Sequence, residues 1–167
     1  EIEPLRAANP SLPITTNFHG DFHDLDYRRF AGNLDFASYD NYPAWGRDAA
    51  REAMLSAFKY DFTRSCMNKQ FALMESTPSQ VNWQEVCKLK KPGMHLLSSI
   101  QAVAHGADTV QYFQWRKGRG ASEKFHGAVV DHEGSEHTRT FREVAEVGKA
   151  LETLTPVLGS KTHSDAA

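Results

Sequence analysis

The chain has 167 residues, and 19 lysines and arginines against 21 aspartates and glutamates give it a formal net charge of −2. Its 40% hydrophobic and 24% charged residues are typical of a soluble globular domain and exclude a disordered or fibrous chain. The near-neutral charge argues against a nucleic-acid surface, and no apolar run approaches the roughly 18–20 residues of a membrane span. Since no signal-like segment opens the sequence, we expect a cytoplasmic protein that binds neither nucleic acid nor membrane.

Cysteine content and length narrow the class further. The two cysteines, Cys66 and Cys87, are too few for a disulfide framework or a four-cysteine zinc site. The length allows about one domain with a moderate core. It falls short of the roughly 200–250 residues of a complete eight-stranded α/β barrel.

Short strands alternate with helices along the chain. Runs rich in β-branched or aromatic residues predict strands over residues 12–18, 34–39, 70–74 and 109–113. Helical periodicity predicts helices over residues 2–8, 24–32, 49–62, 93–104 and 140–154, with Gly106 ending the fourth. This alternation indicates an α/β fold with a parallel sheet. We expect residues 1–156 to form four βα units and residues 157–167 a polar linker toward a following domain, so that both ends look like cuts through a larger fold.

Polar side chains follow the predicted strands, where the ligand sites of parallel α/β folds form. Glu75 is the most informative, because four apolar residues lead directly to it. A carboxylate there can be a nucleophile, a general base or a metal ligand, or it can cap the next segment or pair with an arginine. The other candidates at this edge are Asn17, Asp40, Trp115, Glu123 and His126.

Aromatic residues in the same loops favour a sugar ligand. Phe18, Tyr42, Trp83, Trp115 and Phe125 fall in or beside the strand-end loops. Aromatic rings stack on the apolar C–H faces of sugars while carboxylates bind the hydroxyls. The alternative is that these rings only close the top of the core.

Metal sites are not indicated. The pairs His19 and His23, and His132 and His137, lack a strong ligand motif and are more simply solvated loop histidines. We therefore expect no metal and no cofactor. The lysines within residues 88–91 are most simply a solvated face.

Several phrases in order resemble glycoside hydrolase family 42, the β-galactosidases of the barrel-type retaining glycosidases. They cover nearly the whole chain and are TTNF (residues 15–18), DNYP (40–43), LME (73–75), PSQVNW (78–83), KPG (91–93), QAVAHGAD (101–108), YFQWR (112–116), EKFHGAVVDH (123–132) and FREVAEVG (141–148).

The resemblance implies a fragment of a (β/α)8 TIM barrel whose four βα units correspond to strands five to eight. Glu75 is similar to the family's nucleophile and Trp83 to its sugar-platform tryptophan. Glu123 and His126 resemble the pair that binds galactose hydroxyls. Asp40 and Asn17 match positions lining the pocket, and Trp115 matches the tryptophan at the pocket floor.

The departure from the family is large. The acid/base glutamate of the family follows an asparagine on strand four, and no such pair occurs here in that context. A retaining mechanism needs two carboxyl groups roughly 5–5.5 Å apart. We therefore expect a half-site with little or no turnover alone, and the family's cysteine zinc cluster also belongs to the missing half.

The leading hypothesis is the C-terminal half of a retaining β-galactosidase barrel acting on terminal β-D-galactosides. One alternative is a non-catalytic half-barrel that binds sugar or pairs with a partner, because an unclosed sheet exposes two edges. Another is a related glycosidase such as an α-L-arabinopyranosidase. The resemblance also implies a homo-oligomer, often a trimer in the family, or pairing with the complementary barrel half.

Overall fold

The computed structural model describes residues 2–20 and 22–162. Its elements in chain order are α1 (Ile2–Ala8), β1 (Asn17–Phe18), α2 (Tyr27–Ala31), β2 (Ala37–Asp40), α3 (Ala49–Met67), β3 (Phe71–Glu75), α4 (Met94–Ala104), β4 (Ala107–Val110), the short 3-10 helix η1 (Ser122–Phe125), α5 (Arg139–Thr153) and a second 3-10 turn η2 (Thr155–Val157).

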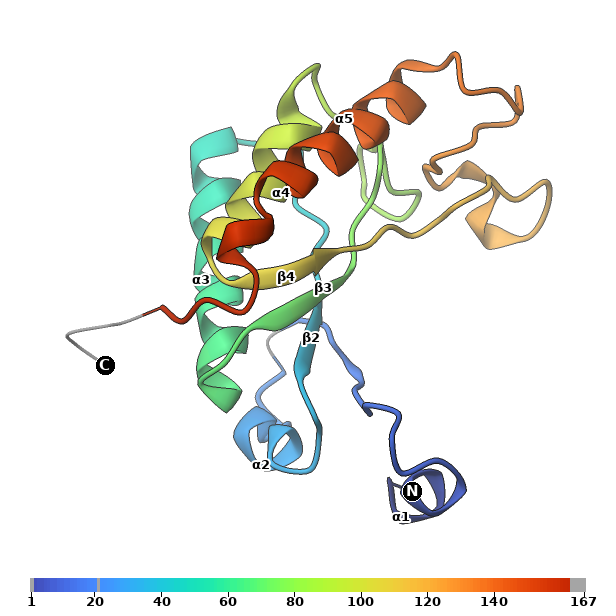
Figure 1. The fold of residues 1–167 in the computed structure, drawn as a ribbon. Helices are drawn as coiled ribbons and strands as arrows, with labels where there is room; N and C mark the ends of the chain where they lie inside the picture. The colour runs from blue at the N-terminus through green and yellow to red at the C-terminus, as the bar shows by residue number, and fades with distance from the viewer. Residues whose placement is uncertain (1, 21, 163–167) are drawn as a thin grey trace.

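The four strands form one parallel sheet in the order β1-β2-β3-β4. Helices α3, α4 and α5 lie together on one side of this sheet (Figure 1). Because all strands run in the same direction, their carboxyl ends lie along one edge, where the loops toward the helices begin. The sheet confirms the predicted α/β fold of four βα units.

All four strands differ in their bounds from the prediction: β2 begins at Ala37 rather than residue 34 and ends one residue later, and β3 is shifted by one residue. The predicted strand over residues 12–18 pairs regularly only at Asn17–Phe18, although Ile14 N donates to Asp35 Oδ2 (2.6 Å) and keeps the preceding residues beside β2. The predicted strand over residues 109–113 begins earlier, at Ala107. The chain enters the sheet directly after Gly106, whose φ of +99° turns it out of α4.

Helix α3 is longer than its periodicity predicts. It begins at the Asp48 cap, whose carboxylate accepts hydrogen bonds from Ala50 N (3.0 Å) and Arg51 N (3.4 Å). It continues to Met67 rather than ending at residue 62, and Asn68 then turns left-handed with φ of 52°. Asparagine tolerates this conformation better than most residues, so Asn68 supplies the C-terminal stop.

An apolar core fills the space between the sheet and the helices. Phe71 and Leu73 of β3, Tyr39 of β2 and Tyr60 of α3 are buried in it, and the Tyr60 and Phe71 rings stack at 5.5 Å. Near the carboxyl edge the core becomes polar. Asn41 is buried there, and its Nδ2 donates to Ser56 Oγ (3.0 Å) and Tyr60 Oη (2.8 Å).

The last segment is only partly described. Residues 155–157 form η2 and residues 158–162 have no regular secondary structure, while residues 163–167 lie outside the described residues. The linker over residues 157–167 stays a prediction. No helix within residues 2–20 and 22–162 is long and apolar enough to cross a membrane.

Asn41→Ala should lower the free energy of unfolding by about 1–3 kcal/mol, because it leaves two buried hydroxyl groups without their amide partner. Chemical denaturation of both proteins measures the difference. Asn33→Ala is the matched control, since Asn33 Nδ2 makes an exposed hydrogen bond to Arg29 O. Equal losses for both variants would contradict a special role of the buried amide.

Candidate active site

A shift in strand register places Glu75 in the site. Tyr39 pairs with Leu73, but the next residue of β2, Asp40, pairs with Glu75, so Met74 is an extra residue in β3. Without the shift, Glu75 would share the face of Leu73, which packs into the core under the helices. With it, Glu75 lies opposite Asp40 at the carboxyl edge.

Two donors hold the Glu75 carboxylate. The Tyr42 hydroxyl donates to Oε2 at 2.7 Å and Asn17 Nδ2 donates to Oε1 at 3.3 Å. The same amide nitrogen also lies 2.9 and 3.0 Å from the two carboxylate oxygens of Asp40. The structure therefore brings together Asn17, Asp40 and Glu75, three of the predicted residues, across β1, β2 and β3. The backbone adds Asn41 N donating to Glu75 O at 2.9 Å.

Burial sets the protonation of the groups around Glu75. It raises the pKa of Asp40 to about 6; the Asn17 hydrogen bond opposes this shift, and the charge of Glu75 reinforces it. Burial and the hydrogen bond to Glu75 also raise the pKa of the Tyr42 hydroxyl well above its ordinary value, with Asp40 and Glu123 adding to the shift. Tyr42 consequently keeps its proton and remains a donor at neutral pH.

A cavity of about 360 Å³ opens beside this carboxylate. Its lining is formed by His19, Gly20, Tyr39, Asp40, Tyr42, Lys59, Glu75 and Trp83. Trp83 is 58% exposed and its ring meets the Tyr42 ring edge-on at 5.7 Å. An accessible indole beside two carboxylates suits a ligand with one apolar face and several hydroxyls, as a sugar has.

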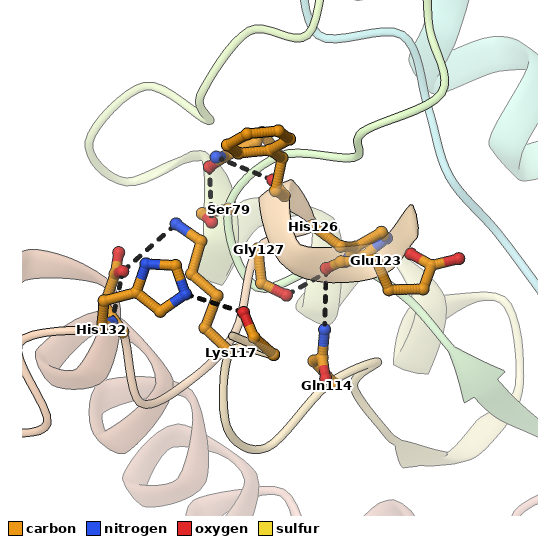
Figure 2. Close-up of polar contacts among 11 residues, drawn as sticks. Ser79, Gln114, Lys117, Glu123, His126, Gly127 and His132 are labelled. Carbon is orange, nitrogen blue, oxygen red and sulfur yellow. Dashed lines mark hydrogen bonds and ion pairs between the residues drawn. The ribbon is translucent and has the colours of Figure 1, made fainter. Parts of the chain in front are cut away.

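Two long loops dock on each other at the edge of the site. Asn82 Nδ2 donates to Ser122 O at 2.6 Å and Gly127 N donates to Gln80 O at 2.7 Å. These bonds join the loop that carries Trp83 to the loop that carries Glu123 and His126. Figure 2 shows Glu123 and His126 close to each other on the second loop, beside Gly127 and Gln114.

His126 is buried and contacts the aromatic rings beside the site. It is 1% exposed and meets the rings of Phe113 at 4.9 Å and Tyr42 at 5.9 Å, both edge-on. Its Nδ1 lies 3.0 Å from Gly127 O. The His126 ring thus packs directly against the residue that holds Glu75.

The remaining predicted residues are placed less directly. Glu123 is near enough for its charge to raise the pKa of Tyr42, but it is not among the described residues that line the cavity. Trp115 is 65% exposed and is likewise absent from that lining, so its place at the pocket floor stays a prediction. Within the described residues, no group of three or more His, Cys, Asp and Glu side chains is arranged to hold a metal ion.

Sequence reasoning missed the role of Tyr42. It placed Tyr42 among the loop aromatics, whereas the structure gives its hydroxyl the shortest hydrogen bond to Glu75. The available signal was its position two residues after the strand-end Asp40.

The fold and site define a partial α/β barrel with two carboxylates and an indole at the carboxyl edge of its strands. A family model described as beta-galactosidase, that of glycoside hydrolase family 42, matches residues 1–154. The chain belongs to this family.

Named relatives agree over nearly the whole chain. It is 56% identical to beta-galactosidase BglY of Alicyclobacillus acidocaldarius over 100% of this chain and 25% of that protein. The crystal structure of a beta-galactosidase from a Rahnella strain aligns with a TM-score of 0.94 and 58% identity, covering 98% of this chain and 24% of the other. A catalytic mutant of Gan42B from G. stearothermophilus aligns with a TM-score of 0.93 and 51% identity, covering 98% and 25%. The chain thus spans about a quarter of the length of these relatives.

Gly127→Ala should loosen the docking of the two loops. An added Cβ would lie 2.8 and 2.9 Å from the backbone O and N of Gln80, closer than real contacts allow. We expect a loss of about 1–3 kcal/mol in the free energy of unfolding, measured by denaturation. Gly120→Ala is the control, because no atom lies within 4 Å of its added Cβ, and we expect a change within about 0.5 kcal/mol. A neutral Gly127→Ala would refute the close approach.

Asp40→Asn should change how stability depends on pH. The pKa of Asp40 is about 6 in the folded chain against an ordinary 3.8. The folded state therefore binds more protons between these values, and its stability falls as pH rises through this window. Relative to the original chain, Asp40→Asn should gain stability from pH 4 to 7 in denaturation series. The exposed Asp24→Asn is the control; parallel curves for Asp40→Asn and the original chain would contradict the shift.

Proposed function

We propose that this chain is the C-terminal half of the catalytic barrel of a retaining β-galactosidase that hydrolyses terminal β-D-galactosides. The observation that carries the proposal is the Glu75 carboxylate, held by Tyr42 and Asn17 at the end of β3 beside the cavity lined by Trp83. The family membership and the beta-galactosidase relatives support the choice of reaction.

In the proposed mechanism, a Glu75 oxygen attacks the anomeric carbon of the galactoside. The bond from that carbon to the leaving oxygen breaks, and its electron pair goes to the leaving group, which is protonated by a second carboxylic acid. Water then attacks the galactosyl ester and gives up a proton to the same second carboxylate, which releases galactose and restores Glu75. The two donors on Glu75 orient its oxygens for the first step.

The other residues bind the sugar in this proposal. Trp83 stacks on the galactose ring, and Glu123 and His126 bind its hydroxyls. A sugar with a misplaced hydroxyl would leave such groups unpaired, which is how specificity for galactose arises. Asp40 and Asn17 line the pocket beside Glu75, and Trp115 forms its floor.

The proton donor is the part this chain does not supply. Glu75 is the nucleophile in this proposal, and the family's acid/base glutamate follows an asparagine on strand four, which the four βα units resembling strands five to eight do not include. We therefore propose that the chain alone has little or no turnover and that a complementary barrel half, from the same polypeptide or a partner, provides the acid. Association into a homo-oligomer belongs to the same proposal.

A second candidate is a half-barrel that pairs with a partner without catalysis. It is favoured by the sheet itself, since β1 and β4 each pair with only one strand within the described residues. Two open edges of a parallel sheet invite added strands.

A covalent trapping experiment tests the leading proposal. The complete polypeptide that contains this chain is treated with a 2-deoxy-2-fluoro-β-D-galactosyl fluoride, which slows hydrolysis of the galactosyl ester. We expect mass spectrometry to find the sugar on Glu75. Glu75→Gln should lower kcat on a nitrophenyl β-galactoside by at least about 10⁴-fold, while Glu136→Gln in an exposed loop should keep it.

The isolated chain is assayed in parallel. A Glu75-dependent rate from residues 1–167 alone would contradict the proposed half-site. An inactive complete polypeptide with no label on Glu75 would overturn the galactosidase mechanism. It would favour the second candidate, a non-catalytic half-barrel that pairs with a partner.

A further inference from the structure

A lysine lies in the interior directly behind the site. The sequence predicts a solvated lysine run, but Lys90 is only 3% exposed. Its Nζ donates to Thr77 O at 2.7 Å and lies 4.9 Å from the centre of the Trp45 ring. Lys90 is therefore held by a charge-assisted hydrogen bond and a cation–π contact.

The two groups that Lys90 contacts, the Thr77 carbonyl and the Trp45 ring, belong to the loops that follow Glu75 and Tyr42 in the chain. Thr77 follows Glu75 by two residues in the loop after β3, and Trp45 follows Tyr42 by three residues in the loop after β2. Tyr42 in turn donates to Glu75. The Lys90 ammonium thus joins the backbone that carries the carboxylate to the loop that carries its hydrogen-bond donor.

The rest of Lys90 is anchored to a third element. Its N donates to Ser79 O at 3.2 Å, and Arg139 Nη2 at the start of α5 donates to Lys90 O at 2.9 Å. Arg139 also forms an ion pair with Glu143 at 2.8 Å. The side chain therefore reaches toward the site from a backbone that α5 fixes.

The charges around Lys90 leave it sensitive to pH. Burial lowers the pKa of Lys90 to about 7, and the Glu143 carboxylate of α5 opposes the shift. Arg139 of α5 pairs with that same carboxylate. His95 of α4 stays neutral, because burial and the charges of Lys90 and Arg139 lower its pKa to about 3. Lys90 therefore changes charge near neutral pH, whereas His95 does not.

Stability does not account for a charged group here. Burial of the ammonium costs free energy that the hydrogen bond, the ring contact and the Glu143 charge do not fully offset, since the pKa of Lys90 is lowered to about 7, and apolar residues of similar size often fill such places at no loss. Its contacts fall instead on the two loops that set the geometry of Glu75.

We propose that Lys90 is a positioning residue for Glu75: its ammonium, clamped between the Thr77 carbonyl and the Trp45 ring, holds the Glu75 and Tyr42 segments in the geometry for attack. The inference rests on the proposed function of Glu75. Loss of the proton weakens both contacts, so the positioning fails as pH rises.

The experiment uses the complete polypeptide that contains this chain and 2,4-dinitrophenyl β-D-galactoside. Dinitrophenolate leaves without protonation, so the acid residue does not impose its own alkaline limb on the formation of the galactosyl ester. Single-turnover rates are measured from pH 5.5 to 9 for the original protein, Lys90→Met, Lys90→Arg and Lys91→Met. Lys91 is the exposed neighbour and serves as the matched control.

We expect the rate of the original protein and of Lys91→Met to fall with an apparent pKa of about 7. Lys90→Met should be slower by about 10²-fold at pH 6, the size of effect that follows from misplacing a reacting group by about 1 Å, and its rate should lack the fall near pH 7; the titration of Asp40 near pH 6 is common to all four proteins. Lys90→Arg keeps its charge throughout and should lack the fall.

Other results would overturn the inference. A Lys90→Met enzyme with the original rate and pH profile refutes the positioning role, and so does a Lys90→Arg enzyme that keeps the fall near pH 7. Should Lys90→Met fail to fold in a thermal melt, the Lys90→Arg profile decides alone. An original protein with no galactosidase rate refutes the proposed function itself, which separates the two failures.

Discussion

The one-residue register shift between β2 and β3 is the constraint on which the site depends. Side chains alternate between the two faces of a strand, and Leu73 faces the core beneath the helices. Strict alternation would bury Glu75 on that same face. Because Asp40 pairs with Glu75 and Met74 is left as the extra residue, the carboxylate turns to the face where Asn17 and Tyr42 reach its two oxygens.

The sequence was enough to predict that Asn17, Asp40 and Glu75 lie together at the strand ends, but not how their side chains are arranged. Strand-end positions in a parallel sheet follow from the alternation of strands and helices, so Asn17, Asp40 and Glu75 could be grouped in advance. The register shift could not be predicted from the sequence, because it depends on how two strands far apart in the chain pair with each other. The hydrogen bond of the Tyr42 hydroxyl and the burial of Lys90 also depend on contacts between distant segments, so the sequence did not predict them. The neighbouring Lys88 and Lys91 are exposed.

Pairs of segments, rather than single residues, keep the site in shape. Lys90 joins the loops after β2 and β3, while Asn82 and Gly127 join the loops after β3 and β4. The loop after β3 takes part in both connections; it begins directly after Glu75 and carries Trp83. The loop after β3 therefore links the segment that begins at Glu75 to the loops on either side of it.

The buried side chains differ in polarity between the core under the helices and the strand ends. The core cluster around Phe71, Leu73 and Ala102 is formed by apolar and aromatic side chains, whereas the buried residues of the strand-end loops include Asn41, Thr77, Lys90 and His126. Each buried polar group costs free energy unless it is paired, so a core built for stability alone would not collect them at one edge. Three of them connect to Glu75 within one or two contacts: Asn41 N bonds to Glu75 O, His126 packs on Tyr42, and Lys90 bonds to Thr77 O. The requirement that one carboxylate be held in a fixed direction accounts for a polar interior that folding by itself does not need.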